Sequence, residues 1–289
     1  MSPFKNVALI GKYKSPEIAE PLLKLAVFLE QRGVQVMLDP LTAAYVGKNR
    51  HEVLPLERIG ERAELAVVIG GDGTMLNIAR TFAPYDVALV GVNQGRLGFL
   101  TDLSIKTMFE SIGSILDGRF VTERRMLLES EVLSAGQPAA RVLAFNDVAV
   151  NKGAEGSLIE IEVRIDGRFV YNLRSDGLIV ASPTGSTAYA LSSGGPILHP
   201  SLDAIALVPV SPHTLSNRPI VVGGNSVIEI TVHSGADPRV HFDSHSHHEL
   251  SARDQVVVRR CPHQIRLLHP LDHNYYHMLR EKLHWSETL

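Results

Sequence analysis

The stretch LAVVIGGDGT, residues 65–74, decides the fold, because an apolar run leads there into a turn with three glycines. A buried strand, a glycine turn and a helix start place backbone N–H groups at the positive end of the helix, where phosphate binds without a side-chain cation. We predict the helix over residues 75–80. Since glycine leaves the backbone bare enough for a pyrophosphate to approach, the turn indicates a nucleotide site.

Asp72 is the one ionisable side chain in this turn. A carboxylate repels phosphate, so its presence indicates that it binds a metal, bonds to a hydroxyl or takes a proton from a nucleophile. The alternative interpretation is a tight turn in which Asp72 caps the helix. The turn lacks the Lys-Ser/Thr pair of a P-loop, and Leu76 stands where the dinucleotide fingerprint needs its third glycine.

The composition sets wider bounds. The chain has 289 residues, of which 45% are hydrophobic, enough for two moderate cores. Its formal net charge of −3 gives no general attraction for nucleic acid or an anionic membrane. Cys261 is the one cysteine, and no signal peptide or apolar run of membrane-spanning length is present. We expect a cytoplasmic protein without a nucleic-acid or membrane partner.

Around the glycine turn, short apolar runs alternate with helical patterns. The runs are apolar throughout, which is typical of parallel strands covered on both faces. The sequence therefore predicts an α/β first domain with a Rossmann-like parallel sheet over residues 1–123. Its expected strands are residues 6–10, 34–38, 65–69 and 87–90, its expected helices are 15–33, 53–62 and 106–116, and residues 39–51 and 91–100 are expected to be connections.

From about residue 124 the runs become short, often alternating and β-branched, with turns such as Asp166-Gly167 between them. They predict a mostly-β second domain over residues 124–270. Its expected strands are residues 126–133, 142–150, 158–165, 168–173, 178–181, 204–208, 227–232 and 256–258. The tail over residues 273–284 is helical again, so we expect residues 271–289 to return to the first domain and complete it.

A second informative stretch is SPTGSTAYALSSGGP, residues 182–196. Its hydroxyls, glycines and single aromatic, Tyr189, are suited to hydrogen bonds with ribose and base edges, which favours a nucleoside site. The alternative is a Ser/Thr-capped helix with Tyr189 in the core. Asn146-Asp147 offers an amide beside a carboxylate, suited to paired sugar hydroxyls, although such a pair is more often a simple turn.

Together, residues 70–74, Asn146-Asp147 and residues 182–196 resemble the NAD kinase family in order and approximate spacing, and the resemblance covers nearly the whole chain. Lipid kinases of the diacylglycerol kinase type and phosphofructokinases have similar glycine turns. They lack the segment Thr-Gly-Ser-Thr-Ala-Tyr, which stands here at residues 184–189. The resemblance implies ATP-dependent phosphorylation of the 2′-hydroxyl of the adenosine ribose of NAD, giving NADP. It also implies a divalent metal ion, Mg²⁺ bound with ATP, and a homo-oligomer, either a dimer or a tetramer.

The resemblance assigns site residues as well. Asp72 is the expected proton acceptor, Gly73 contributes backbone contacts, and Tyr189 lies against the adenine. The remaining implied nucleotide contacts are Asn146, Asp147, Ser157, Arg174, Asp176, Thr187, Ala188, Ala190, Leu191, Ser192 and His245.

Three further features have structural or functional interpretations. In a strand, His241, Asp243, His245 and His247 would share one face as a transition-metal array, although solvated or interface histidines explain the same pattern. Cys261 is expected to be a structural thiol at a strand end. The Arg124-Arg125 pair is expected to be solvated rather than bound to phosphate.

Two other function classes stay open. One is a lipid or sugar kinase that shares only the glycine turn, which the intact segment 182–196 disfavours. The other is a non-catalytic NAD(P) sensor in which Asp72 merely bonds to the ribose.

Overall fold

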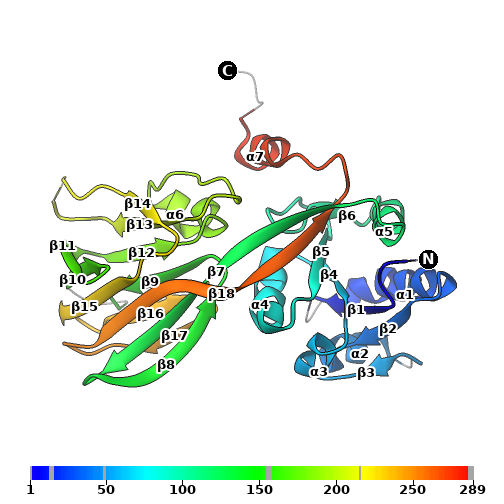
Figure 1. Ribbon diagram of the computed structural model, residues 1–289, viewed down its shortest axis with the longest axis horizontal. Coiled ribbons are helices and arrows are strands. Elements are labelled where there is room, and N and C mark those ends of the chain that lie inside the picture. Colours follow the sequence, from blue (N-terminus) through cyan, green and yellow to red (C-terminus); the bar gives the residue numbers. More distant parts are fainter. Residues whose placement is uncertain (1, 13–15, 48–49, 154–157, 215, 286–289) are drawn as a thin grey trace. The chain divides into compact units, whose positions relative to one another are not determined.

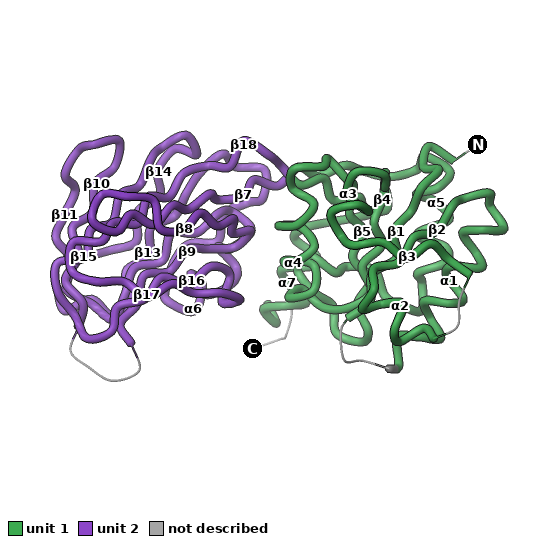
Figure 2. Tube along the Cα trace, turned by 90° about the horizontal axis from the view of Figure 1, so that it is seen from below, with its two compact units in different colours: residues 1–124, 265–289 green, residues 125–264 purple. Residues whose placement is uncertain are grey.

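The computed structural model describes residues 2–12, 16–47, 50–153, 158–214 and 216–285. The chain divides into two compact units, Met1–Arg124 with Ile265–Leu289 (unit 1) and Arg125–Gln264 (unit 2), coloured in Figure 2. The unit boundaries fall inside two long strands, β7 (Val121–Ser134) and β18 (Gln255–His269). Each of these strands therefore contributes residues to both units.

Unit 1 is built on a parallel sheet in the order β3-β2-β1-β4-β5, with the carboxyl end of β18 beside β5 (Figure 1). All of these strand pairs are parallel, which confirms the predicted α/β class. The strands are β1 (Asn6–Gly11), β2 (Gln35–Leu38), β3 (Glu52–Val53), β4 (Leu65–Gly70) and β5 (Ala88–Asn93), with the short β6 (Leu103–Ser104) paired to β5.

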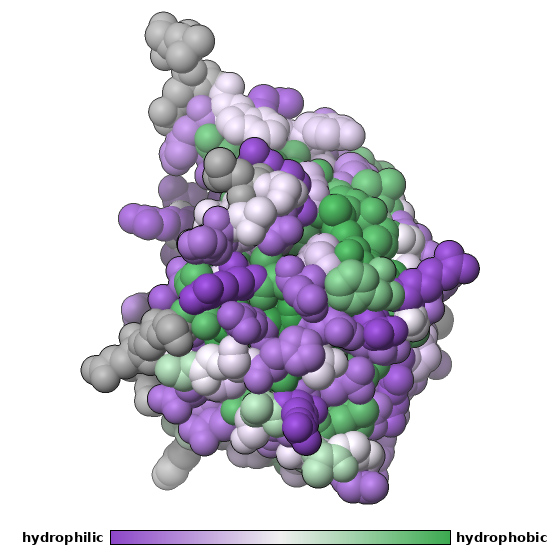
Figure 3. All heavy atoms as spheres, turned by 90° about the vertical axis from the view of Figure 1, so that its left-hand side faces the viewer, coloured by the Kyte–Doolittle hydropathy of each residue, from purple (hydrophilic) through white to green (hydrophobic). Residues whose placement is uncertain are grey.

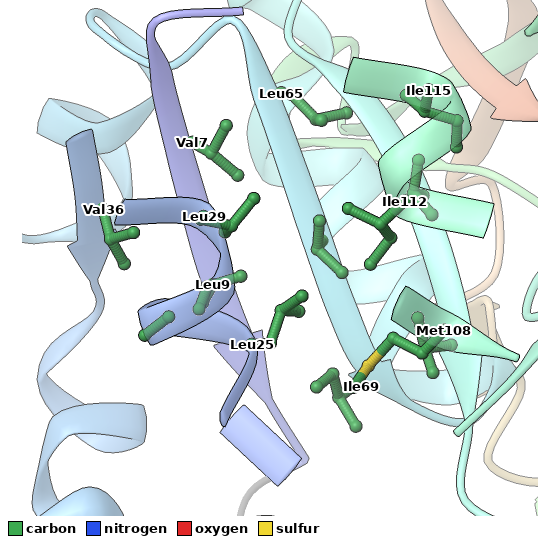
Figure 4. Packing of buried hydrophobic residues seen from close by; sticks show 14 of the residues in the cluster. Val7, Leu9, Leu25, Leu29, Val36, Leu65, Ile69, Met108, Ile112 and Ile115 are labelled. Carbon is green, nitrogen blue, oxygen red and sulfur yellow. The ribbon is translucent and has the colours of Figure 1, made fainter. Parts of the chain in front are cut away.

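Helices α1 and α5 cover the same face of this sheet, as Figure 4 shows. Leu25 and Leu29 of α1 and Ile112 of α5 meet strand residues such as Val7 and Leu65 in one core. The helices of unit 1 are η1 (Pro16–Ile18), α1 (Ala19–Gln31), α2 (Pro40–Val46), α3 (Leu56–Gly60), α4 (Asp72–Phe82), η2 (Ala83–Tyr85), α5 (Met108–Leu116) and α7 (Tyr275–Leu283). Helix α7 belongs to unit 1, so the predicted return of the C-terminal helix is confirmed.

Two expectations for unit 1 are wrong. Residues 39–51 are not all connection, because α2 begins directly after Asp39, whose carboxylate accepts hydrogen bonds from the N–H groups of Leu41 and Thr42 at 3.0 and 3.3 Å. Proline at the first helical position suits this start, since its ring presets φ and no N–H is needed there. The helix expected over residues 53–62 is the shorter α3, because Val53 belongs to strand β3 and pairs there with Leu38 of β2.

Unit 2 consists of two antiparallel groups of strands packed over a common core. One is a six-stranded sheet in the order β14-β13-β12-β9-β16-β17, and the other has the order β11-β10-β15-β18 with β7 and β8 attached. Alternate residues such as Val148, Val180, Ile161 and Val256 fill the core between them. The further elements are β8 (Gln137–Ala144), β9 (Asp147–Asn151), β10 (Ile159–Ile165), β11 (Arg168–Ser175), β12 (Gly177–Ala181), η3 (Gly185–Thr187), α6 (Tyr189–Ser192), β13 (Ala204–Val210), β14 (Ile220–Gly223), β15 (Ile228–Ser234), β16 (Arg239–Phe242) and β17 (Ser246–Glu249).

Several strand expectations for unit 2 need correction. The single strand expected over residues 142–150 is two strands, β8 and β9, separated by a turn at Phe145 and Asn146. Strands β14, β16 and β17 were not predicted, because their glycine, histidine and exposed polar residues obscure the alternation. Strand β18 is much longer than expected, so Cys261 lies buried within it and not at a strand end.

Arg125 also differs from expectation. The residue is 3% exposed, and its guanidinium donates a hydrogen bond to the Thr184 hydroxyl at 3.2 Å. The expected solvated pair is therefore wrong for this member, because a charged group at this depth is tolerated only with polar partners. Its neighbour Arg124 is exposed.

No helix among the described residues has the length and apolar composition needed to cross a membrane.

The surface seen in Figure 3 interleaves hydrophilic with hydrophobic residues. In unit 2, Phe169 and Val170 on strand β11 and Val221 on strand β14 are exposed apolar side chains. Both strands lie at sheet edges, where exposed apolar groups favour association.

Replacing the cap of α2 tests why this helix forms. We expect Asp39→Ala to lower the free energy of unfolding by about 1 kcal/mol, because two backbone N–H groups lose their acceptor. Urea unfolding followed by circular dichroism measures the loss. Asp39→Ser retains a side-chain oxygen and should keep most of the stability; an equal loss in both variants would contradict the capping role.

Candidate active site

The glycine turn forms the predicted strand–turn–helix. Strand β4 ends at Gly70, Gly71 is the N-cap with extended backbone, and α4 begins at Asp72. The turn lies at the carboxyl end of a parallel sheet, where open α/β folds bind ligands. A side chain on Gly71 or Gly73 would meet no other atom within 4 Å, so the backbone at the helix start is uncovered. This arrangement is suited to an anion.

The Asp72 carboxylate is held by the second glycine-rich connection. Oδ2 accepts a hydrogen bond from the N–H of Phe99 at 2.8 Å, and Oδ1 accepts from the N–H of Leu100 at 3.0 Å and from the Thr101 hydroxyl at 3.2 Å. The carboxylate makes no capping bond to its own helix, so the capping alternative is wrong. A carboxylate offers about four acceptor positions, and one on Oδ2 stays open for a hydroxyl.

Two residues that the sequence interpretation missed shape this connection. A side chain on Gly98 would overlap both Asp72 Oδ1 and the Thr101 hydroxyl, so only glycine lets the carboxylate approach. Asn93, at the end of β5, is buried, and its amide donates to the carbonyls of Thr101 and Leu103 at 3.1 and 2.8 Å. Sequence shows the glycines, but the pairing of this connection with Asp72 is a long-range contact.

In unit 2, the hydroxyl-rich segment uses much of its polarity internally. The Ser182 hydroxyl donates to the Phe145 carbonyl at 2.6 Å, and the Ser186 hydroxyl donates to the Pro183 carbonyl at 2.6 Å. A side chain on Gly185 would overlap the carbonyl of Asn146, so the glycine lets the two segments touch. These groups fix the loop, and the half-buried residues after it, Thr187 onward, are the ones that face outward.

Two candidate residues, Asp147 and Tyr189, lie on one face of the six-stranded sheet. Asp147 of β9 lies opposite Ala181 of β12, and Tyr189 of α6 packs against the apolar cluster that contains Ala181 and Ala149. Because side chains alternate along a strand, Asp147 and Ala149 point to this face while Val148 enters the core. The structure thus brings Asn146, Asp147 and Tyr189 together, although they are distant in sequence.

The electrostatics of this face follow from burial. Burial, strengthened by the nearby charge of Asp243, raises the pKa of the Asp147 carboxyl to about 7. Burial also raises the pKa of the Tyr189 hydroxyl, and the carboxylates of Asp147 and Asp176 raise it further. Tyr189 is therefore a neutral phenol with its ring partly accessible.

Asp243, expected only as a member of the histidine array, holds the turn before β9. Its Oδ2 accepts from the N–H of Phe145 at 2.8 Å, and its Oδ1 accepts from the N–H groups of Asn146 and Asp147 at 2.7 and 3.1 Å. Backbone groups that a turn leaves unpaired are costly when buried, and one carboxylate satisfies three of them. No local sequence signal links residue 243 to residue 146.

The proposed histidine array is also corrected. The chain turns after β16, so His241 and His247 face each other across a hairpin, with ring centroids 5.5 Å apart. His245 lies exposed in the turn, and the carboxylate of Asp243 is turned to the backbone. The four residues do not share one strand face. Burial, then the charges of His247 and Arg239, lowers the pKa of His241.

The other predicted nucleotide contacts do not form one cluster with Asp147 and Tyr189. Arg174 is exposed on β11, with Nε 3.7 Å from Glu160 Oε1, and Asp176 Oδ1 lies 2.7 Å from Lys152 Nζ. Ser157 lies outside the described residues. The remaining candidates belong to the short α6 segment or its start, with Ala190 buried, Ala188 and Leu191 half-buried and Ser192 exposed.

Comparison with known proteins finds a matching family model for each of the two units. The model of the ATP-NAD kinase N-terminal domain matches residues 7–120, and that of the ATP-NAD kinase C-terminal domain matches residues 145–270. A curated NAD kinase from Nitrosospira multiformis is 62% identical over 285 residues, covering 99% of this chain and 97% of that protein. The NAD kinase of Nitrosomonas eutropha is 59% identical over 286 residues with the same coverage.

Solved structures agree. The crystal structure of yeast NADH kinase complexed with NADH has a TM-score of 0.92 at 26% identity and covers 100% of this chain and 90% of that one. An NAD kinase from Archaeoglobus fulgidus in complex with ATP has a TM-score of 0.75 at 25% identity, covering 96% and 99%. The likeness extends far beyond the glycine turn, which excludes a lipid or sugar kinase that shares that turn alone. Both domain models and the identity to curated enzymes show that this chain functions as an NAD kinase and belongs to the NAD kinase family.

Proposed function

We propose that Asp72 is the proton acceptor when the 2′-hydroxyl of the adenosine ribose of NAD takes a phosphoryl group from ATP. The observation that carries this role is the fixed carboxylate at the start of α4, with one acceptor position open. A hydroxyl placed there would donate its hydrogen to Oδ2. The relative from Archaeoglobus fulgidus, solved in complex with ATP, supports ATP as the donor.

The chemistry makes modest demands on a base. Phosphoryl transfer passes through a loose transition state, so catalysis consists mainly of positioning and charge stabilisation. The hydroxyl proton leaves late, and a carboxylate can accept it although an alcohol has a much higher pKa. Three hydrogen bonds keep Asp72 in place, which limits the orientations that the base samples before reaction.

The triphosphate charge needs neutralisation that the glycine turn supplies only in part. Backbone N–H groups at the start of α4 stabilise negative charge through the helix dipole. We infer that Mg²⁺ bound with ATP would neutralise the rest of the triphosphate charge. Since the open position on Asp72 Oδ2 is assigned to the hydroxyl, phosphate oxygens of ATP and water would be the ligands of this ion.

In unit 2, we infer that Tyr189 packs against the adenine and that Asn146 and Asp147 bind sugar hydroxyls. The supporting observations are that Asp243 holds the backbone of Asn146 and Asp147, and that Tyr189 of α6 lies near the Asp147 carboxyl. With a pKa of about 7, the Asp147 carboxyl can donate or accept a hydrogen bond near neutral pH. Gly73, Ser157, Arg174, Asp176, Thr187–Ser192 and His245 remain proposed contacts.

We further propose a cytoplasmic homo-oligomer, either a dimer or a tetramer. The family resemblance implies this assembly, and the apolar side chains at the edge strands β11 and β14 are consistent with a covered surface.

Asp72→Asn tests the base directly. We expect turnover to fall by about 10²- to 10⁴-fold, because the amide cannot accept the proton, while NAD binding is largely retained. A coupled assay with an NADP-specific dehydrogenase measures turnover, and calorimetry measures binding. Unchanged turnover would remove Asp72 from the role. A parent protein that binds NAD but forms no NADP would favour the sensor function.

Gly98→Ala tests whether the position of Asp72 matters. The new methyl group overlaps Asp72 Oδ1, so the carboxylate has to swing away from Phe99 and Leu100. We expect turnover to fall by about tenfold or more with the fold retained. Gly95→Ala in the same connection is the matched control, since its methyl group meets no atom within 4 Å. Equal turnover in the two variants would contradict the positioning argument.

The raised pKa of Asp147 predicts a pH dependence of stability. The folded state holds the proton up to about pH 7, whereas the unfolded carboxyl loses it near its ordinary pKa of 3.8, so stability falls as pH rises between these values. We expect the parent protein to lose about 2 kcal/mol more than Asp147→Asn between about pH 5 and about pH 8. Urea unfolding at both pH values measures this; parallel losses would contradict the assignment.

A further inference from the structure

Unit 1 contains a polar cluster that the roles above do not use, made of Asp102, His269 and His273. Asp102 Oδ2 lies 2.8 Å from His269 Nδ1 and 2.9 Å from His273 Nδ1. Within the described part of the chain, this is the one group of three His, Cys, Asp or Glu side chains whose possible ligand atoms all lie within 4.8 Å of one another. Two ring nitrogens and one carboxylate oxygen thus converge on a single point.

The backbone brings these residues together from distant parts of the chain. Asp102 precedes the short strand β6, His269 ends β18, and His273 follows a turn in which its N–H donates to the Pro270 carbonyl at 3.0 Å. The turn stacks the two imidazole rings with centroids 3.9 Å apart and planes 19° apart. Stacking with both Nδ1 atoms toward one oxygen orients the rings as ligands of a common centre.

The ring nitrogens that face away from Asp102 have a different environment. The Nε2 atoms of His269 and His273 are both buried without a hydrogen-bond partner. Glu123 Oε2 lies 3.3 Å from His269 Nε2, an ion-pair distance that lacks hydrogen-bond alignment. His269 is 3% exposed, and the Nδ1 atoms of the two rings, which face Asp102, are the ring nitrogens that a common centre would bind.

We propose that Asp102, His269 and His273 bind a divalent transition-metal ion, with Zn²⁺ as the best fit. Two imidazole nitrogens and one carboxylate oxygen are a common three-ligand set for zinc, which leaves a fourth position for water. Mg²⁺ prefers oxygen ligands and is a poor match for two imidazoles. Glu123 stands behind His269, where carboxylates orient metal-binding histidines in other proteins.

The geometry requires only a small adjustment. Ligand atoms about 2.0–2.1 Å from a tetrahedral ion are about 3.3 Å apart, so the Asp102 oxygen has to move outward by about half an ångström.

The cluster borders a cavity through which an ion could enter, and it lies next to the segment that holds Asp72. Asp102 and His273 line a cavity of about 560 Å³, together with Asn274 and His277 from the start of α7. Asp102 directly follows Thr101, whose hydroxyl donates to Asp72. A bound ion would therefore join the C-terminal segment to the connection that holds Asp72.

Zinc titration of the tag-free, chelator-treated full chain tests the proposal. We expect calorimetry and elemental analysis to show one Zn²⁺ per chain, and excess Mg²⁺ not to displace it. At free Zn²⁺ about 100-fold above Kd, the thermal midpoint should rise by about 5–10 °C. Cobalt substitution should give the visible absorption of a four-coordinate ion.

Variants locate the ion. His273→Gln should abolish stoichiometric binding, and Glu123→Gln should weaken it by about 10- to 100-fold. His277→Gln is the matched control, because it lines the same cavity outside the cluster and should bind zinc as the parent does. Circular dichroism checks that each variant folds.

Three results would overturn the proposal. Equal zinc affinity in the parent and in His273→Gln would remove the cluster as the site. Loss of zinc in His247→Gln alone would place the ion at the β16–β17 hairpin. No binding by the parent at micromolar zinc would make the cluster a hydrogen-bonded charge network.

Discussion

The contact between the Asp72 carboxylate and the N–H groups of Phe99 and Leu100 is the interaction on which the candidate active site of unit 1 depends. It joins the two glycine-rich connections at the carboxyl end of the parallel sheet. Without it, the glycine turn would be a bare anion site with a repelling acid beside it. With it, the acid has a defined orientation. Residue 98 has to be a glycine, because a larger side chain would overlap the Asp72 carboxylate.

Unit 2 uses the same physical device. The Asp243 carboxylate accepts from three successive backbone N–H groups and so holds the turn that carries Asn146 and Asp147. A carboxylate with two or three backbone donors is both ordered and charge-stabilised, which a turn built from neutral side chains achieves less well. In each unit, one aspartate therefore binds a backbone segment that is far away in sequence.

Two other aspartates, Asp147 and Asp102, are both largely buried but have pKa values shifted in opposite directions. Asp147 is buried near another carboxylate, so its pKa rises to about 7. Asp102 is also deeply placed, yet two imidazoles contact it and hold its pKa well below the ordinary value despite the opposing effect of burial. Neighbouring groups, and not depth alone, decide whether a buried carboxyl is neutral or charged.

Much of the architecture could be predicted from sequence. Uniformly apolar runs identified the parallel strands, and alternation identified most strands of unit 2, because both patterns follow from which faces are covered. The missed helix α2 had a readable signal in Asp39-Pro40, an N-cap followed by a first-turn proline. Strands β16 and β17 had no such signal, since their histidines and charged ends resemble a solvated loop.

The sequence by itself determined the fold class, the glycine turn and the family, because strand periodicity and a few motifs are local properties of the chain. Tertiary structure alone decided the partners of Asp72, the support of Asn146 by Asp243 and the meeting of Asp102 with His269 and His273. These contacts join residues separated by about 27 to 170 positions, and nothing in local propensity specifies which distant groups a folded backbone will bring within hydrogen-bond distance.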